Sequence, residues 1–175
     1  MRKFLAVITL AAVLLAGCGS SAEPTETTAP ATSGLHHEEV LDNFEKMLEP
    51  IADQYEMTRV SNLELDDGSF FHHVKVTNKL LGDSYTLLLY YNWEGDVRTV
   101  LLDGERGKRT NLDFAVLSLY VYKSLGLPEI DADDFYDHFN LLTAEPSGSL
   151  SVEGWHLSAI RGEGLLTFGA SFKPE

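Results

Sequence analysis

The feature that most constrains the fold is a series of apolar, alternating segments joined by very short turns. Asp67-Gly68 is a typical hairpin turn, and it precedes an alternating run over residues 70–77. Residues 85–93 are apolar on both faces, which is typical of a central strand. Glu94-Gly95-Asp96 then leads into a further run over residues 97–102. Connections this short join antiparallel strands, so the sequence predicts an antiparallel meander.

Helices are expected before and after this meander. Apolar residues recur at helical spacing over residues 36–55, and Pro50 must bend or break that helix because its ring removes a backbone hydrogen bond. A second helix is expected over residues 112–124, capped by Asn111 and apolar nearly all round. Asp131 is expected to cap a short third helix that ends near residue 142.

Two final strands are expected at residues 155–160 and 165–172, after a loop that includes Gly148. The order of elements predicts an α+β fold, in which about three helices pack mainly on one face of an antiparallel sheet made of a meander and a C-terminal hairpin. The same order, a helix followed by strands in each half, is similar to the tandem helix-plus-sheet repeats of the secreted β-lactamase inhibitor proteins. This similarity implies an inhibitor-like protein as one alternative.

The N-terminal segment carries an export signal. Met1-Arg2-Lys3 is positively charged, and the apolar stretch over residues 4–14 is too short to cross a hydrocarbon core of ~30 Å at ~1.5 Å per residue. Leu15-Ala16-Gly17-Cys18 follows directly. This segment resembles the signal peptide and lipobox of bacterial lipoproteins. The resemblance implies that Cys18 carries a diacylglyceryl group and becomes the first residue after cleavage, with the acyl chains anchoring it in the membrane.

Residues 19–34 are rich in Ser, Thr and Pro and offer no apolar face for a core. The chain is therefore expected to comprise a signal peptide over residues 1–17, a lipidated cysteine with a disordered tether over residues 18–35, and a single α+β domain over residues 36–175. We expect the domain to be anchored to the cell membrane and to face away from the cytoplasm. The lack of a disulfide framework and the Thr/Pro-rich tether favour a Gram-positive surface over a Gram-negative periplasm.

The charge balance and the absence of catalytic motifs exclude several classes of function. The chain has 13 Lys+Arg against 27 Asp+Glu, and such an acidic balance argues against nucleic acid as a partner. No cofactor is expected. His37-Glu38-Glu39-Val40-Leu41 begins like the zinc-protease helix, but leucine stands where the second histidine is required. No Gly-x-Ser-x-Gly nucleophile elbow is present in the sequence.

Two groups of residues in the sequence resemble metal ligands, and neither is assigned as a metal site. Phe135 and Tyr136 interrupt the acidic cluster at Asp131, Asp133, Asp134 and Asp137 where a calcium loop requires a carboxylate and a glycine. His72 and His73 are adjacent on a strand and point to opposite faces, so they cannot share an ion. A site requires one histidine from this pair, one from His36-His37, and a third ligand such as His138 or His156.

Two surfaces are candidates for binding a partner. In the apolar strand over residues 85–93, one face holds Tyr91 and Trp93, which are expected in the core. The opposite face holds Tyr90 and Asn92 and is smaller and more polar, so Tyr90 is expected to be partly exposed and to contact a partner. The second candidate is the basic cluster of Arg106, Lys108 and Arg109, which precedes a helix N-terminus that favours anions.

The sequence therefore predicts a non-catalytic binding or protein-interaction module, with another envelope or extracellular protein as its partner. A cell-envelope hydrolase that uses carboxylates or a His-based metal site is the alternative from a different class. The 27 acidic residues do not by themselves identify a catalytic pair for it. A structural component of the envelope remains a third possibility.

Replacing the lipobox cysteine tests the anchor. Because the thioether forms on the Cys18 sulfur, Cys18→Ser is expected to abolish lipid attachment and signal processing at this site. Incorporation of a radioactive fatty acid into the protein measures this directly. Equal labelling of the Cys18→Ser protein and the unchanged chain contradicts the prediction.

Overall fold

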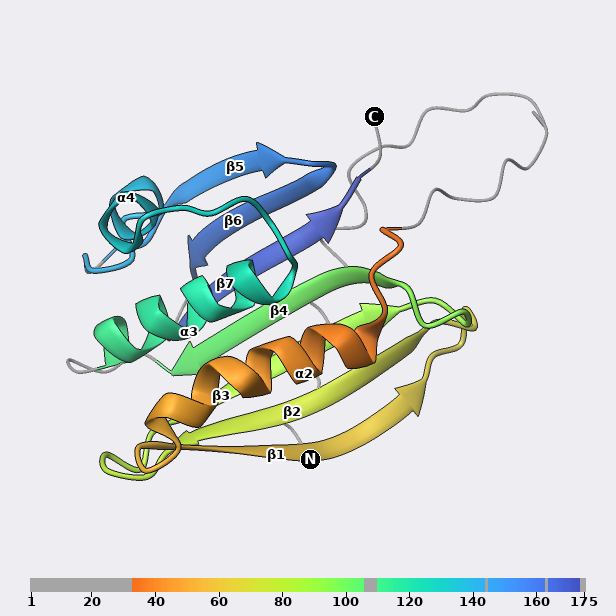
Figure 1. Ribbon diagram of the computed structural model, residues 1–175, viewed down its shortest axis with the longest axis horizontal. Helices are drawn as coiled ribbons and strands as arrows, with labels where there is room; N and C mark the ends of the chain where they lie inside the picture. Colours follow the sequence, from red (N-terminus) through yellow and green to blue (C-terminus); the bar gives the residue numbers. More distant parts are fainter. Residues whose placement is uncertain (1–32, 106–109, 144, 163, 174–175) are drawn as a thin grey trace. The chain divides into compact units, whose positions relative to one another are not determined.

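Seven antiparallel strands form one sheet in the part of the chain that the computed structural model describes, residues 33–105, 110–143, 145–162 and 164–173 (Figure 1). The strands are β1 (Tyr55–Glu64), β2 (Phe70–Asn78), β3 (Ser84–Tyr91), β4 (Val97–Glu105), β5 (Gly148–Val152), β6 (Trp155–Arg161) and β7 (Leu165–Phe172). Their order across the sheet is β1-β2-β3-β4-β7-β6-β5. The predicted α+β class with an antiparallel sheet is confirmed.

The first four strands form the predicted meander, and β7 joins it along β4. The strand β5 was predicted as part of a loop, and that prediction is wrong. Gly148 begins β5, where an added Cβ would lie 2.5 Å from the carbonyl oxygen of His138. The glycine that suggested a loop is instead required because the strand passes close to the backbone at the end of a helix.

The helical segments are α2 (His37–Leu48), the 3-10 turn η1 (Glu49–Ile51), α3 (Thr110–Ser124) and α4 (Ala132–His138). The first helix was expected to reach residue 55, but Pro50 lies in η1 and Tyr55 already begins β1. The apolar side chains past Pro50 therefore belong to a turn and a strand and do not continue the helix. Among the helices in the described ranges, none combines the length and apolar composition needed to cross a membrane.

The short helix α4 begins as predicted and ends early. The carboxylate of Asp131 accepts a hydrogen bond from the Asp133 backbone N–H at 2.9 Å, which caps the first turn. The helix ends at His138 and not near residue 142, because the backbone of Asn140 has a φ of 49°. A left-handed residue cannot continue a right-handed helix.

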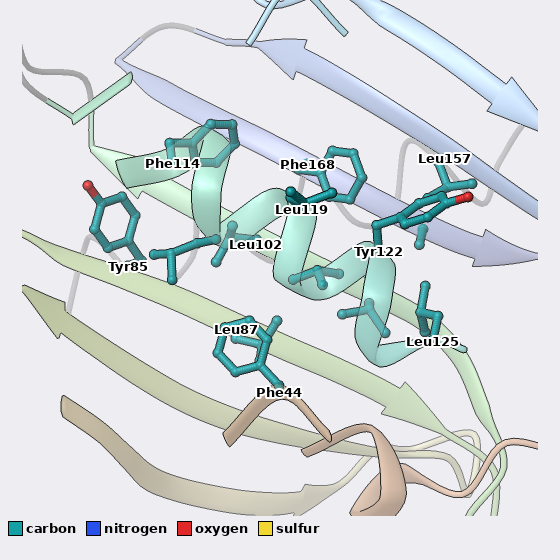
Figure 2. Packing of buried hydrophobic residues seen from close by; sticks show 14 of the residues in the cluster. Phe44, Tyr85, Leu87, Leu102, Phe114, Leu119, Tyr122, Leu125, Leu157 and Phe168 are labelled. Atoms are coloured by element: carbon teal, nitrogen blue, oxygen red, sulfur yellow. The ribbon is translucent and has the colours of Figure 1, made fainter. Parts of the chain in front are cut away.

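The main core is one buried cluster that contains residues of the helices and alternating residues of the strands. Figure 1 shows α2 and α3 side by side in front of the sheet, and these two helices contact each other. In Figure 2, Phe44 of α2 and Phe114 of α3 extend toward the same cluster as Leu87 of β3. The largest side chains that are fully buried include Tyr85, Phe44, Phe114, Phe135, Phe139 and Phe168. Each such side chain contributes about 1.5–3 kcal/mol by its removal from water.

The helix α3 is the central element of this core. It contacts α2, α4, β4 and β7, so apolar neighbours surround most of its circumference. Phe114, Leu117 and Val121 are completely buried. The sequence predicted a helix that is apolar nearly all round, and its position among four other elements explains that pattern.

A polar network connects the first turn of α3 to the strands. The Tyr55 hydroxyl donates to Asp113 Oδ1 at 2.6 Å, and the Asn78 amide donates to Asp113 Oδ2 at 2.8 Å. The Tyr85 hydroxyl also donates to Oδ2, at 3.4 Å. Burial, followed by the effects of the Asp113 carboxylate, raises the pKa of both Tyr55 and Tyr85. Asp113 thus links α3 to β1, β2 and β3.

Removing this carboxylate should destabilise the fold. Asp113→Ala leaves the buried Tyr55 hydroxyl and the Asn78 amide without their acceptor, so the free energy of unfolding is expected to fall by about 2–3 kcal/mol. Urea unfolding measures the change, and Asp113→Asn should lose less because its side-chain oxygen still accepts. Glu129 is exposed, and Glu129→Ala serves as the control with an expected change within about 0.5 kcal/mol. An equal stability of the Asp113→Ala and Glu129→Ala proteins contradicts the prediction.

Candidate functional site

The strand β3 presents two different faces. Tyr85, Leu87, Leu89 and Tyr91 are at most 5% exposed and belong to the main core or border it. Tyr90 lies on the opposite face and is half-buried, as the alternation predicts. Burial, reinforced by the nearby Asp103 carboxylate, raises the pKa of the Tyr90 hydroxyl.

Tyr90 lies at one end of a row that crosses three strands on this opposite face. The register pairs Leu63 of β1 with Phe71 of β2, and Phe71 with Tyr90 of β3. The rings of Phe71 and Tyr90 are 5.9 Å apart, and Leu63 is 50% exposed. We call Leu63, Phe71 and Tyr90 the Tyr90 row. It places a contiguous apolar and aromatic strip on the face that does not carry the main core.

Polar residues of β4 and β7 border the row. Tyr90 pairs with Thr99, and Thr99 pairs with Ser171. Nearby, the Thr167 hydroxyl donates to Asp103 Oδ1 at 2.5 Å. Burial raises the pKa of Asp103 and the hydrogen bond from Thr167 opposes that shift, with burial the larger effect. The strip therefore has hydrogen-bonding groups along one side.

Trp93 does not lie in the core, and Asn92 does not share the open face, so both expectations are wrong. Strand β3 ends at Tyr91, and Trp93 is 77% exposed. Asn92 is buried, and its side-chain oxygen accepts from the backbone N–H groups of Glu94 and Asp96 at 3.0 and 2.9 Å. This Asx-type turn ends the strand before residue 93, so the alternation of faces does not extend to Trp93.

A second candidate site lies where the N-terminus of α2 meets β2. One ligand atom each from His37, Glu38 and His72 lies within 4.8 Å of the other two. His37 and Glu38 are in the first turn of α2, and His72 is on the core face of β2, opposite Leu89. The rings of His37 and His72 are 6.1 Å apart. We call these three residues the His37 cluster.

The position of the His37 ring is determined by two contacts. Its Nδ1–H donates to the backbone carbonyl of Gly95 at 3.2 Å, and its plane stacks on Tyr91 with a centroid distance of 3.9 Å. Because a carbonyl only accepts hydrogen bonds, Nδ1 carries the proton and Nε2 carries the lone pair of the neutral ring. Nε2 lies 3.4 Å from Glu38 Oε1.

Burial favours the neutral form of both histidines. It lowers the pKa of His37 and that of His72, and in each case it is the largest effect. His72 is 7% exposed, and its Nδ1 is buried without a hydrogen-bond partner among the residues that the structure describes. Burial opposes ionisation of Glu38, but the hydrogen bond from Arg59 at 2.7 Å and the charge of Arg59 outweigh it and hold the pKa of Glu38 below its ordinary value.

The other histidines considered for metal binding are elsewhere. His138 Nε2 is 2.9 Å from the carbonyl oxygen of Ser149, and His156 Nδ1 is 3.2 Å from the Ser151 hydroxyl. The sequence analysis required one histidine from each pair for a metal site, which is the combination in this cluster, but it did not consider Glu38 as the third ligand. The available signal was its position next to His37 in a first helical turn, together with the alternation that places His72 on the core face.

Several predicted features fall outside the described residues. These are the signal peptide, Cys18, most of the tether, and the basic cluster of Arg106, Lys108 and Arg109. Comparisons with protein-family models, curated proteins and solved structures find no match.

The contrast between Trp93 and Tyr91 can be measured. Trp93→Ala should change the free energy of unfolding by no more than about 0.5 kcal/mol, because the side chain is largely in water. Tyr91→Ala should cost about 3–5 kcal/mol, because it empties a buried site. It also removes the hydroxyl that donates to Asn62 at 2.6 Å. Denaturant unfolding of both variants provides the comparison, and a larger loss for Trp93→Ala is inconsistent with this turn.

Proposed function

We propose that the protein is a lipid-anchored, extracytoplasmic binding module without catalytic activity. In this proposal a diacylglyceryl group on Cys18 holds the chain to the membrane, and residues 19–34 separate the folded part from the lipid surface. The partner is another envelope or extracellular protein. The order of positive residues, apolar stretch and lipobox in residues 1–18 supports the anchor.

The observation that carries the binding proposal is the Tyr90 row. Tyr and Phe are enriched at protein interfaces because they bring a large contact area with few rotatable bonds, and Tyr adds a polar group. Phe71 and Tyr90 are both half-buried and in ring contact, so the strip is preformed. A partner that covers it removes apolar surface from water without first ordering these side chains.

We further propose that the helices pack on one face of the sheet, so that the Tyr90 row belongs to the opposite face. The burial pattern supports this arrangement. The strand residues that share a cluster with the helices, such as Leu87 and Leu102, are on the face opposite Tyr90. Lys75, on the same face as Tyr90, is exposed and supplies a charged position near the strip. An apolar centre with a polar rim is the usual composition of a protein-binding surface.

Mutation of the row should separate binding from folding. Tyr90→Ala is expected to weaken partner binding by about 1–2 kcal/mol, a loss of about 5–30-fold in affinity, because it removes an interface aromatic. Cross-linking and pull-down from native membranes identify the partner, and titration with that partner measures the affinity. The stability of Tyr90→Ala should change much less than that of Tyr91→Ala, which empties the core.

The matched control is Tyr136→Ala, since Tyr136 is a half-buried tyrosine on α4 and is not part of the row. Its affinity for the partner should match that of the unchanged protein. If Tyr90→Ala and Phe71→Ala both bind the partner with full affinity, the binding surface lies elsewhere. In that case the basic cluster at Arg106, Lys108 and Arg109 is the next surface to test.

A further inference from the structure

We propose that His37, Glu38 and His72 form a binding site for a divalent transition-metal ion, with Zn²⁺ as the best-matched ion. The site is independent of the Tyr90 row, because His72 and Leu89 are paired on the core face of the sheet. It joins the first turn of α2 to the middle of β2, two segments that are more than thirty residues apart in the chain.

The first argument is the pairing of two acceptors. With Nδ1–H committed to Gly95, the neutral His37 ring directs the lone pair of Nε2 toward Glu38 Oε1, which is 3.4 Å away. Two lone pairs at this distance repel each other unless a proton or a cation lies between them. A metal ion satisfies both atoms.

The second argument is independent and concerns His72. This side chain is more than nine-tenths buried, yet its Nδ1 has no hydrogen-bond partner in the described structure. A buried polar atom without a partner destabilises the folded state, so such atoms are rare unless they have a role. The ring is 6.1 Å from that of His37, close enough for one nitrogen of each ring to bind a common ion.

The donor set favours zinc over calcium or magnesium. Two imidazoles and one carboxylate form a typical zinc ligand set, which leaves a fourth position for water or for an external ligand. Calcium and magnesium prefer oxygen ligands and six or more of them. Zinc bonds of about 2.0–2.1 Å place tetrahedral ligands roughly 3.4 Å apart. The His37 and Glu38 atoms already have this separation, so only the distances to His72, which are at most 4.8 Å, must shorten, by up to about 1.4 Å. Glu38 can supply this movement, since its side chain is 44% exposed.

The neighbouring groups provide the outer shell of such a site. Metal-binding histidines commonly donate their second ring N–H to a carbonyl, as His37 does to Gly95. Arg59 donates to Glu38 Oε2 at 2.7 Å, which leaves Oε1 directed at the histidine. Its positive charge opposes a bound cation, but Arg59 also lies 3.4 Å from the Asp42 carboxylate, which offsets part of that charge.

The test is a zinc titration of the full chain after treatment with a chelator. We expect one Zn²⁺ per chain by calorimetry, and a rise in melting temperature of about 5–10 °C when free zinc is about 100 times Kd. His37→Gln and Glu38→Gln should each weaken binding at least tenfold. His73→Gln is the matched control, because it removes a histidine next to His72 on the opposite face and should change the affinity less than twofold.

Spectroscopy distinguishes this site from adventitious binding. Co²⁺ bound to two histidines and a carboxylate in a four-coordinate site gives intense visible absorption, whereas six-coordinate cobalt absorbs weakly. We expect the intense form, its displacement by Zn²⁺, and no displacement by millimolar Ca²⁺. His72→Gln should abolish it, and Glu38→Gln provides the decisive variant if the buried substitution prevents folding.

Three results would overturn the proposal. They are the absence of zinc binding by the full chain, full affinity in both His37→Gln and Glu38→Gln, and an equal loss in His73→Gln. Nuclear magnetic resonance of the His37 ring then identifies the alternative, a protonated imidazole that pairs with Glu38. None of these results depends on the protein partner, so the metal site and the Tyr90 row can fail separately.

Discussion

The rest of the structure depends on the burial of α3 against the middle of the sheet. Strands β4 and β7 are adjacent in the sheet although more than fifty residues separate them, and α3 contacts both. Phe114 and Leu117 on the helix and Leu102 and Phe168 on the two strands share one buried cluster (Figure 2). This packing holds the N-terminal meander and the C-terminal strands together in one sheet. Its favourable free energy must exceed the entropic cost of closing the long loop between β4 and β7.

Polar groups at the edge of the main core need hydrogen-bond partners because they are removed from water. Asp113 is satisfied because Tyr55 and Asn78 donate to it from the strands. His72 is on the core face of β2, and its Nδ1 lacks a hydrogen-bond partner among the described residues. The complete network at Asp113 stabilises the native state, whereas the unpartnered His72 nitrogen is one of the observations from which we propose a metal site.

On the opposite face, the side chains that point away from the core are fixed by the alternation of the strand, because successive residues point to opposite faces. Leu87 and Tyr91 fill the core, and Tyr90 must then point away from it. The pairing of β3 with β2 brings Phe71 beside Tyr90, and the pairing of β2 with β1 adds Leu63. The strip in our proposed function therefore follows from strand register, and a slip of one residue would place these side chains in the core.

The sequence alone determined the antiparallel meander, the buried character of α3, the Asp131 cap and the half-exposed position of Tyr90. All four depend on periodicity or on short-range hydrogen bonds, which are local properties of the chain. It did not determine the end of β3 before Trp93, the strand at Gly148, or the meeting of His37 and Glu38 with His72. The end of β3 depends on a local turn, in which Asn92 accepts from Glu94 and Asp96, and the apolar alternation does not display it. The strand at Gly148 and the His37 cluster depend on segments that are distant in the chain, the backbone at the end of α4 and the contact of α2 with β2. Tertiary structure decided these two because such contacts arise from register and packing, which residue order does not display.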